Sequence, residues 1–340
     1  MSVVFLLAIL LEINFSWKIR RKHLERNIKI VLAWNEHFAQ ISSGLIQVPH
    51  TDILPDQKFL SQGDDVERYC NIYKRNMTPF YKHYCASIPF VFEEQCRVGV
   101  ALLRMANCLS DGQHLTFYET ESQYGTNVRT LAELASGKVL ALTNGLHKEK
   151  FEELFRDPFS YCCLGYFCDV TPQFIQSSSD LNVFTDGFDV VYENATFQFY
   201  DKDRFEQIAH LKEVMKDDGI LICLEKLHQI DTVEYEKREQ VKDEKYKSLY
   251  FSANEIMWKR TVVLAGMQEL QVDYETLISA LKQHFSYIYL LWNSTNFYEI
   301  AASNSLQKIN DFLSLLPLPF IPKEFSFEGD LNVPKRVCPI

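Results

Sequence analysis

The sequence predicts a doubly wound α/β fold, in which helices cover both faces of a mostly parallel sheet. Three observations lead to this prediction. Residues 114–137 have the pattern of a buried strand, a sharp turn and a helix, the unit that opens such sheets. Residues 188–194, 201–219 and 220–227 repeat the order strand, helix, strand. Residues 284–305 contain two apolar runs around the turn NSTN, which predicts an antiparallel hairpin at the end of the sheet.

The opening unit carries the residues that we expect to contact a ligand. Its apolar run is formed by Leu115, Phe117 and Tyr118, Glu119 ends the run, and Gly125 closes the turn. A helix is predicted next, because apolar residues recur there at helical spacing: Val128, Leu131, Ala132 and Leu134. A strand, a turn with an acid at its mouth and a helix N-terminus together form a cofactor cradle in doubly wound folds.

The spacing of this unit resembles the first motif of class I S-adenosylmethionine (SAM) methyltransferases. That motif has an acid, three glycines at alternate positions and a leucine six residues after the last glycine. Glu119, Gly125 and Leu131 stand at its first, last-glycine and leucine positions. Glu121 and Gln123 replace the other two glycines, a departure from the motif because glycine lets the backbone approach a ligand.

Later segments extend the resemblance over residues from about 95 to 305. The run FDVVYEN at 188–194, the amphipathic helix over 201–219 and the strand after it are typical of the class. The resemblance implies a seven-stranded sheet, mostly parallel with an antiparallel closing hairpin, and SAM lying across the carboxyl ends of strands one, two and four. The run 188–219 is also similar to uncharacterised methyltransferases encoded by tailed bacteriophages.

The resemblance implies a role for the residues at the strand ends. Glu119 and Gly125 would face the methionine part of SAM, and Glu121 and Gln123 in the same loop are further cofactor-binding candidates. Thr143 or Asn144 would face the ribose, where the family has an acid, and Asp169 with Val170 would face the adenine. The alternative interpretation of Asp169 is that it caps the turn before Pro172. Asn194 would lie near the methyl group, and the candidate catalytic residues are Glu193, Glu225 and Lys226, because a base assists a hydroxyl acceptor.

These features predict a SAM-dependent methyltransferase acting on a small molecule or a protein. Two alternatives stay open. The missing glycines and the missing ribose acid favour a methyltransferase fold reused as a non-catalytic binding or structural subunit. The third alternative is a nicotinamide-dependent enzyme, although the chain lacks a GxGxxG motif.

The composition limits the compartment and the partners. The net charge of −10 argues against a general nucleic-acid binder, which needs a basic footprint. The nine cysteines contain no CxxC pair, which favours buried thiols in a reducing compartment. We therefore expect a cytoplasmic protein (in the host cytoplasm if a phage encodes it). No histidine pair has metal-ligand spacing, so no metal site is expected.

The segments outside the core motifs allow more than one interpretation. The apolar run 3–11 is too short to span a bilayer, so residues 1–29 form either a packed helix or a weak membrane-surface anchor, if they belong to the native start. Residues 1–90 are predicted as an N-terminal helical or cap region, 91–305 as the methyltransferase-like domain, and 306–340 as a helix and tail. The charged segment 231–258 is either a solvated helical insertion or a lid. Four aromatic residues of the cap either line a pocket or belong to the core: Tyr73, Phe80, Tyr81 and Tyr84.

Overall fold

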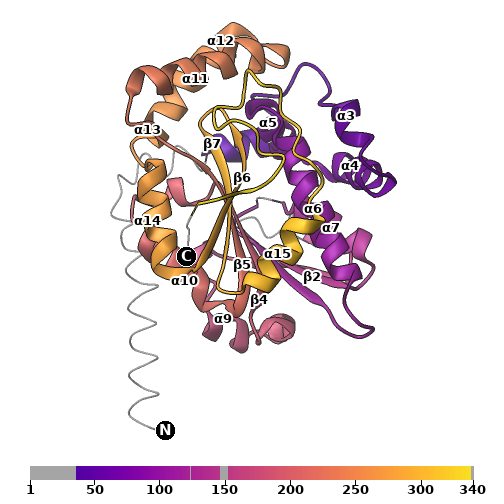
Figure 1. Cartoon of the computed structure of the whole chain (residues 1–340). Helices are drawn as coiled ribbons and strands as arrows, with labels where there is room; N and C mark the ends of the chain where they lie inside the picture. The colour runs from indigo at the N-terminus through magenta and orange to yellow at the C-terminus, as the bar shows by residue number, and fades with distance from the viewer. Residues whose placement is uncertain (1–35, 123, 146–151, 338–340) are drawn as a thin grey trace.

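An eight-stranded sheet forms the centre of the molecule (Figure 1). The structure is a computed structural model that describes residues 36–122, 124–145 and 152–337. The strand order is β3-β2-β1-β4-β5-β7-β6-β8. The strands are β1 Leu115–Glu119, β2 Val139–Gly145, β3 Ser160–Leu164, β4 Phe188–Asn194, β5 Met215–Lys226, β6 Tyr287–Ser294, β7 Phe297–Ser303 and β8 Lys335–Arg336.

The pairing of the strands places a switch point in the middle of the sheet. Strands β1 to β5 pair in parallel, and the chain winds toward β3 on one side of β1 and toward β5 on the other. Strand β7 pairs antiparallel with both β5 and β6, which confirms the predicted closing hairpin. The prediction of seven strands was wrong by one, because Lys335 and Arg336 of the expected tail pair with β6. The sheet is otherwise mostly parallel with an antiparallel closing hairpin, as predicted.

Helices cover both faces of this sheet and one of its ends. Helices α4, α6, α7 and α15 pack on one face, and α9, α10 and α14 belong to the core of the other. Helices α5, α11 and α12 lie together at the end drawn uppermost in Figure 1. The bounds are α3 Gln57–Leu60, α4 Asp64–Asn76, α5 Pro79–Ser87, α6 Val91–Asn107, α7 Thr126–Ala135, α9 Pro172–Ser177, α10 Arg204–Glu213, α11 Thr232–Lys245, α12 Ala253–Trp258, α13 Ala265–Gln268, α14 Tyr274–His284 and α15 Leu306–Leu315.

The helix predicted over 201–219 is shorter than expected. Helix α10 begins after Asp203, whose side chain caps it by accepting from the Glu206 N–H. It ends at Glu213, because β5 begins at Met215 and contains an irregularity opposite Phe188. Gly219 lies in that strand rather than ending a helix. A Cβ there would lie 2.9 Å from the Lys216 carbonyl oxygen, so the bulge requires glycine.

The sequence also predicts one helical stretch from residue 262 to 281, but the structure divides it. A π-helical turn, η5 Lys259–Leu264, leads into α13, and α14 begins separately after its N-cap Asp273. The segment expected as an insertion or lid contains α11 and α12. The sequence also predicts a helix over 147–155, which falls partly outside the described residues, and residues 1–29 fall wholly outside them. The domain boundaries stay predictions.

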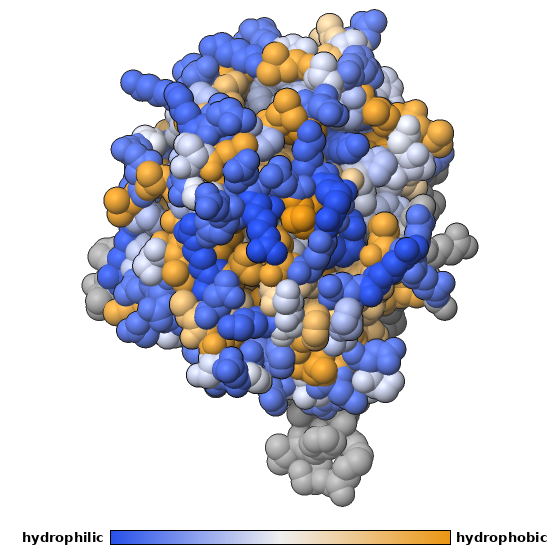
Figure 2. Space-filling model, turned by 90° about the vertical axis from the view of Figure 1, so that its right-hand side faces the viewer, coloured by the Kyte–Doolittle hydropathy of each residue, from blue (hydrophilic) through white to orange (hydrophobic). Residues whose placement is uncertain are grey.

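The surface beside α3 and α4 is mostly hydrophilic. Figure 2 shows apolar atoms there in small areas separated by polar side chains, as is usual for a protein surface in water. In the part of the chain that the structure describes, no helix is long and apolar enough to cross a membrane. The large apolar surfaces of the described residues lie in the interior, where the sheet and its helices meet.

Candidate functional site

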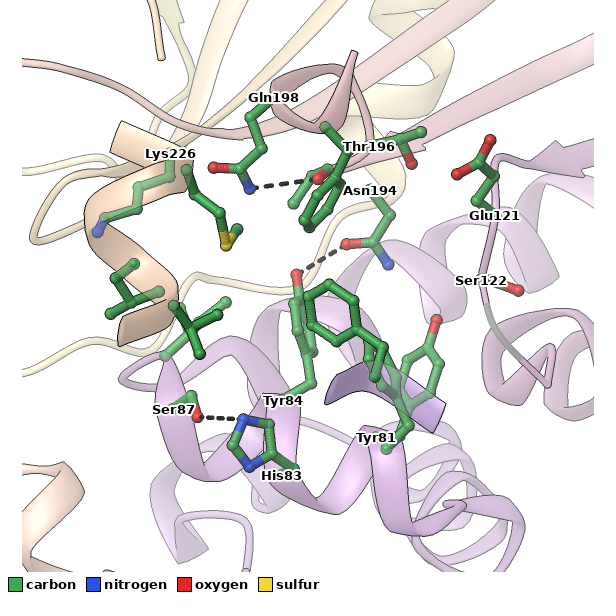
Figure 3. Close-up of a pocket in the computed structure, with 18 of the residues that line it drawn as sticks. Tyr81, His83, Tyr84, Ser87, Glu121, Ser122, Asn194, Thr196, Gln198 and Lys226 are labelled. Carbon is green, nitrogen blue, oxygen red and sulfur yellow. Dashed lines mark hydrogen bonds between the residues drawn. The ribbon is translucent and has the colours of Figure 1, made fainter. Parts of the chain in front are cut away.

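A cavity of about 250 Å³ lies at the carboxyl ends of the parallel strands (Figure 3). Residues at or just beyond the ends of β1, β2, β4 and β5 line it: Ser122, Gly145, Asn194 and Lys226. Helix α5, the segment from α11 to α13 and the loops after β3 and β4 supply further walls. Because the strand order reverses between β1 and β4, this edge is where open α/β sheets bind ligands.

A buried hydrogen-bond network centred on Glu119 supports one end of the cavity. The Oε1 atom of Glu119 accepts from Tyr81 Oη at 2.9 Å, Asn127 Nδ2 at 2.6 Å and Asn194 Nδ2 at 2.8 Å. Tyr84 Oη donates to Asn194 Oδ1 at 2.8 Å, a contact drawn in Figure 3. Burial raises the pKa of Glu119, although these donors act to lower it. The network therefore fixes the side chains of Tyr81, Tyr84 and Asn194, all of which line the cavity.

Glu121 occupies a motif position where glycine is usual, and it adopts a backbone that favours glycine. Its φ is +44°, in the left-handed region that other residues rarely enter. Its Oε1 accepts from the Phe167 backbone N–H at 2.8 Å and from the Tyr200 hydroxyl, and these contacts hold the turn in place. Burial raises the pKa of Glu121 to about 7. Glu121 lines the cavity, whereas Gln123 lies outside the described residues.

Gly125 is required by packing as well as by backbone geometry. Its φ is +63°, and a Cβ at this position would lie only 2.5 Å from Phe155 Cζ. The ring of Phe155 therefore occupies the space beside the turn. Gly125 is not among the described residues that line the cavity.

Asn144 is fully buried and engaged on both sides of its amide. Its Oδ1 accepts from Tyr118 Oη at 2.8 Å and from the Glu121 backbone N–H at 3.0 Å. Its Nδ2 donates to the Gly165 carbonyl oxygen at 2.9 Å. The amide thus ties the ends of β1, β2 and β3 together, and it does not line the cavity.

The other expected ribose and adenine residues also contact their own chain. Thr143 Oγ1 donates to the Glu119 carbonyl oxygen at 2.8 Å. Asp169 Oδ2 accepts from the Tyr166 backbone N–H at 3.0 Å, which is the turn-capping geometry that the sequence left open for it. Val170 is buried in the core of the second face. None of these three is among the described residues that line the cavity, and their cofactor roles stay predictions.

The three candidate catalytic residues have different surroundings. Glu193 is buried, and its Oε1 accepts from the Phe197 backbone N–H at 3.0 Å; burial, followed by the nearby Glu225, raises its pKa well above the usual value. Glu225 forms a fully buried bidentate pair with Arg204, at 2.7 and 3.0 Å. Of the three, only Lys226 lines the cavity.

Four buried lysines meet at the other end of the cavity, and three of them were not predicted as site residues. Lys226 comes from β5, Lys242 from α11, Lys247 from the short helix η4 Lys247–Leu249, and Lys259 from η5. We call these four residues the lysine cluster. Their exposed fractions are 3%, 2%, 2% and 8% in that order. A sequence signal exists for Lys242: the helical spacing of Tyr235, Glu239, Lys242 and Tyr246 places four residues on one buried face of a charged segment.

Two carboxylates face the lysine cluster. Glu239 Oε2 lies 2.9 Å from Lys226 Nζ and 2.6 Å from Lys242 Nζ. Asp243 lies 2.7 Å from Lys247 Nζ and is shared with Arg260 at 3.2 Å. Burial acts to raise the pKa of Glu239, but the lysines hold it well below its usual value.

The lysines themselves respond to burial and to one another. Burial is the main cause that lowers the pKa of Lys242 to about 8, and burial together with Lys242 lowers that of Lys247 to about 8. Lys259 contacts His83 Nε2 and lies 3.2 Å from Ser87 Oγ. Among the described residues, no carboxylate forms an ion pair with Lys259.

Aromatic and apolar side chains join the two ends of the cavity. The rings of Phe80 and Tyr84 stack at 6.5 Å between centroids, and Phe38 meets Phe80 and Phe199 edge to face. Phe80, Tyr81 and Tyr84 line the cavity, while Tyr73 belongs to the core. The sequence left both outcomes open for these residues.

Comparisons with known proteins give matches only at the level of structure. No family model matches the chain, and no curated protein matches it. The plantazolicin methyltransferase BpumL, solved with a monoazolic desmethylPZN analog and SAH, is 8% identical over 86% of this chain and 99% of its own, with a TM-score of 0.46.

Two structures described as O-methyltransferases are similar at a comparable level. One from Klebsiella pneumoniae is 12% identical over 79% of this chain and 99% of its own, with a TM-score of 0.38. One from Nostoc punctiforme is 10% identical over 72% of this chain and 70% of its own, with a TM-score of 0.37. Scores at this level do not assign an activity to this chain.

Proposed function

We propose that this chain is a SAM-dependent methyltransferase whose acceptor binds in the cavity beside β4 and β5. The observation that carries the proposal is the position of the cavity. It touches the loop after β1 at Ser122, the end of β2 at Gly145 and the end of β4 at Asn194. These are the strand ends across which the resemblance places SAM.

The residues at the Glu119 end fit the amino-acid part of such a cofactor. Glu119 does not itself line the cavity, but its Oε1 accepts hydrogen bonds from Tyr81 and Asn194, which do, so it would act on the cofactor through these two side chains. Asn194, Ser122 and Tyr81 line the adjacent wall and would hold the ligand there. A bound SAM supplies an electrophilic methyl carbon, and the task left to the protein is to position the acceptor.

The chain's own residues would position the acceptor and exclude water. The stacked Phe80 and Tyr84 offer a flat apolar surface. Lys226, the one candidate catalytic residue on the cavity wall, lies on the far side from Glu121 in Figure 3. Lys226 therefore contacts the acceptor in this proposal, while Glu193 and Glu225 support the strand ends.

A second candidate function is non-catalytic binding by a reused methyltransferase fold. The observation that favours it is Asn144, because the residue expected at the ribose already uses its amide oxygen for two hydrogen bonds and its amide nitrogen for a third. A ribose hydroxyl would meet no free side-chain acceptor there.

Calorimetry with SAM and with its demethylated product tests the proposal directly. We expect both ligands to bind, and Asn194→Ala to weaken SAM binding by about tenfold or more, because hydrogen bonds that involve charged groups contribute most. The matched control is Asn182→Ala, an exposed amide in the short helix η2 Ser179–Phe184, which should bind as the wild type does. Absence of heat with both ligands would contradict the proposal in favour of non-catalytic binding, and fluorescence titration with NADH tests the nicotinamide alternative.

A further inference from the structure

We propose that the lysine cluster binds an oxyanion, a carboxylate or phosphate group, carried by the small molecule that fills the cavity. The inference depends on the proposed function only where it names that molecule as the methyl acceptor. The residues that line the cavity define the class of ligand. The ligand would carry an anionic group at the end with the lysine cluster and a planar or apolar body along the aromatic residues.

Positive charge exceeds negative charge at this end of the cavity. Four lysines line it, and two carboxylates, Glu239 and Asp243, pair with three of them. Arg260 takes a share of Asp243 and also pairs with the exposed Glu236. The lysine cluster therefore lacks at least one negative partner among the described residues.

Burying that excess charge costs free energy. Each lysine is at least nine-tenths buried, and a buried charge without a partner is strongly destabilising. Cation–π contacts stabilise part of this charge: Lys226 Nζ lies 5.4 Å from the ring centroid of Tyr235, and Lys242 Nζ lies 5.6 Å from that of Phe297. A bound oxyanion would offset the remainder, because it supplies negative charge at the place where the protein lacks it.

The contacts of Lys259 leave one of its donors for a ligand. His83 Nδ1 lies 2.9 Å from the Gln47 carbonyl oxygen, so Nδ1 carries the proton and Nε2 is an acceptor for Lys259. The Ser87 hydroxyl accepts a second hydrogen bond at 3.2 Å. Burial and the neighbouring lysines hold the pKa of Lys259 well below its usual value, and a bound oxyanion would favour the ammonium form. That form has three donors, so one is left for a ligand in the cavity that Lys259 lines.

The remaining walls limit what carries the anion. Phe199, Val263, Leu264, Met267 and Phe297 line the same space, and such surfaces favour aromatic or aliphatic groups. A free inorganic anion would leave these walls without a partner. The site therefore fits an aromatic acid or an aryl phosphate better than inorganic phosphate.

Calorimetry with four probes tests the chemistry of the ligand. We expect phenyl phosphate and benzoate to bind the wild-type protein at least about tenfold more tightly than benzyl alcohol, which lacks the charge. The ratio between phenyl phosphate and benzoate distinguishes the two sources of oxyanion. Inorganic phosphate, the fourth probe, should bind more weakly than phenyl phosphate. Equal binding of benzyl alcohol and both anions, or no binding of either anion, would overturn the inference.

The variant Lys259→Met tests the role of the cluster. Methionine keeps an unbranched side chain of similar length, and the change leaves no carboxylate of the described residues without its lysine. We expect phenyl phosphate affinity to fall about tenfold or more, while the melting temperature of the ligand-free protein stays equal or rises. The matched control is Lys237→Met on the exposed side of α11, where 64% of the side chain is accessible, and it should leave phenyl phosphate affinity unchanged.

The SAM titration separates this inference from the proposed function. Binding of SAM without any preference for anions would leave the methyltransferase proposal standing and remove this one. Binding of phenyl phosphate without SAM would do the reverse. If folded Lys259→Met binds phenyl phosphate as tightly as the wild type does, the role given to the lysine cluster is wrong. If that variant does not fold, the four probes measured on the wild-type protein test the inference.

Discussion

The two ends of the cavity use their polar groups in different ways. At the end above β1, most polar side chains already bond within the protein: Asn144 uses both sides of its amide, and Glu119 Oε1 accepts three hydrogen bonds. At the end beside α11, three of the four lysines pair with two carboxylates, and no carboxylate of the described residues pairs with Lys259. The first end is a rigid framework, whereas the second holds unbalanced charge.

This difference indicates which end of the cavity gains more free energy when a ligand binds. A satisfied network rigidifies a site but contributes little new binding energy, because its donors and acceptors are already used. An uncompensated cluster gains much from a partner of opposite charge. We therefore expect the lysine end to dominate the recognition of the acceptor, and the Glu119 end to determine where it sits.

The largest expected effect comes from a site whose charges are balanced. Arg204→Met would leave Glu225 buried without its bidentate partner, which costs about 3–5 kcal/mol in a buried pair. Urea denaturation of the variant measures this loss. The free energy of unfolding of Lys259→Met is the informative comparison, because removal of a cation from the unbalanced lysine cluster should not destabilise the protein. A similar loss in both variants would break the distinction between the two kinds of site.

The next effect tests the framework end through its glycine. Gly125→Ala would place a Cβ 2.5 Å from Phe155 Cζ at a φ of +63°, so we expect a loss of roughly 2–4 kcal/mol from backbone strain and overpacking. Gly112→Ala is the matched control, since its φ is +82° and nothing lies within 4 Å of the new atom. Thermal denaturation of both isolates the contribution of packing, and equal losses would show that Phe155 yields easily.

A smaller effect is expected from Asn144→Asp. The new carboxylate would face the Gly165 carbonyl oxygen, where the amide now donates at 2.9 Å, so we expect a loss of about 1–3 kcal/mol. SAM affinity measured alongside should not increase. An increase would mean that this position reaches the ribose and that the framework is not fully engaged.

The smallest effect concerns pH at the lysine end. The pKa values of Lys242 and Lys247 are lowered to about 8, so these lysines lose their protons as pH rises through that value. Phenyl phosphate affinity should then fall roughly tenfold between about pH 7 and pH 9. The titratable groups around them belong to the same cluster or to neighbouring helices: Lys226, Lys259, Glu239, Asp243, Arg260 and His83. Isothermal titrations across this range measure the slope, and a flat profile would contradict the cationic role.

In the ligand-free protein, deprotonation of Lys242 and Lys247 increases the free energy of unfolding, whereas it decreases the affinity for the anion. Their folded-state pKa lies below the usual value, so the unfolded chain binds more protons between about pH 8 and pH 10.5. These two groups therefore add stability as pH rises through that interval. This trend and the fall in anion affinity together distinguish the lysines from other titrating groups.

The sequence predicted the layers of the fold well because apolar periodicity determines which residues are buried. The unit around β1 and the hairpin β6–β7 followed from that pattern. The length of α10 did not, because Asp203, Gly219 and the irregular pairing opposite Phe188 act through neighbouring strands. Propensity within a segment carries no information on such contacts.

The candidate site was harder to predict for a similar reason. The strand ends named Glu121, Asn194 and Lys226 as site residues, and all three line the cavity. Lys242 and Lys247 come from the segment 231–258, whose charge suggested exposure to water, and Lys259 directly follows it. Their burial depends on a partner surface formed by α5 and β5, which lies far away in the sequence.

The π-helical turn at Lys259–Leu264 gives the wall of the cavity an unusual dependence on chain length. A π-helix accommodates one residue more per turn than an α-helix. Deletion of a single residue here would restore the regular helix and rotate the residues before the turn by about 100° relative to those after it. Lys259 and Met267, which now share one wall, would then point in different directions. We expect homologues that lack this extra residue to have a residue other than lysine at the position of Lys259.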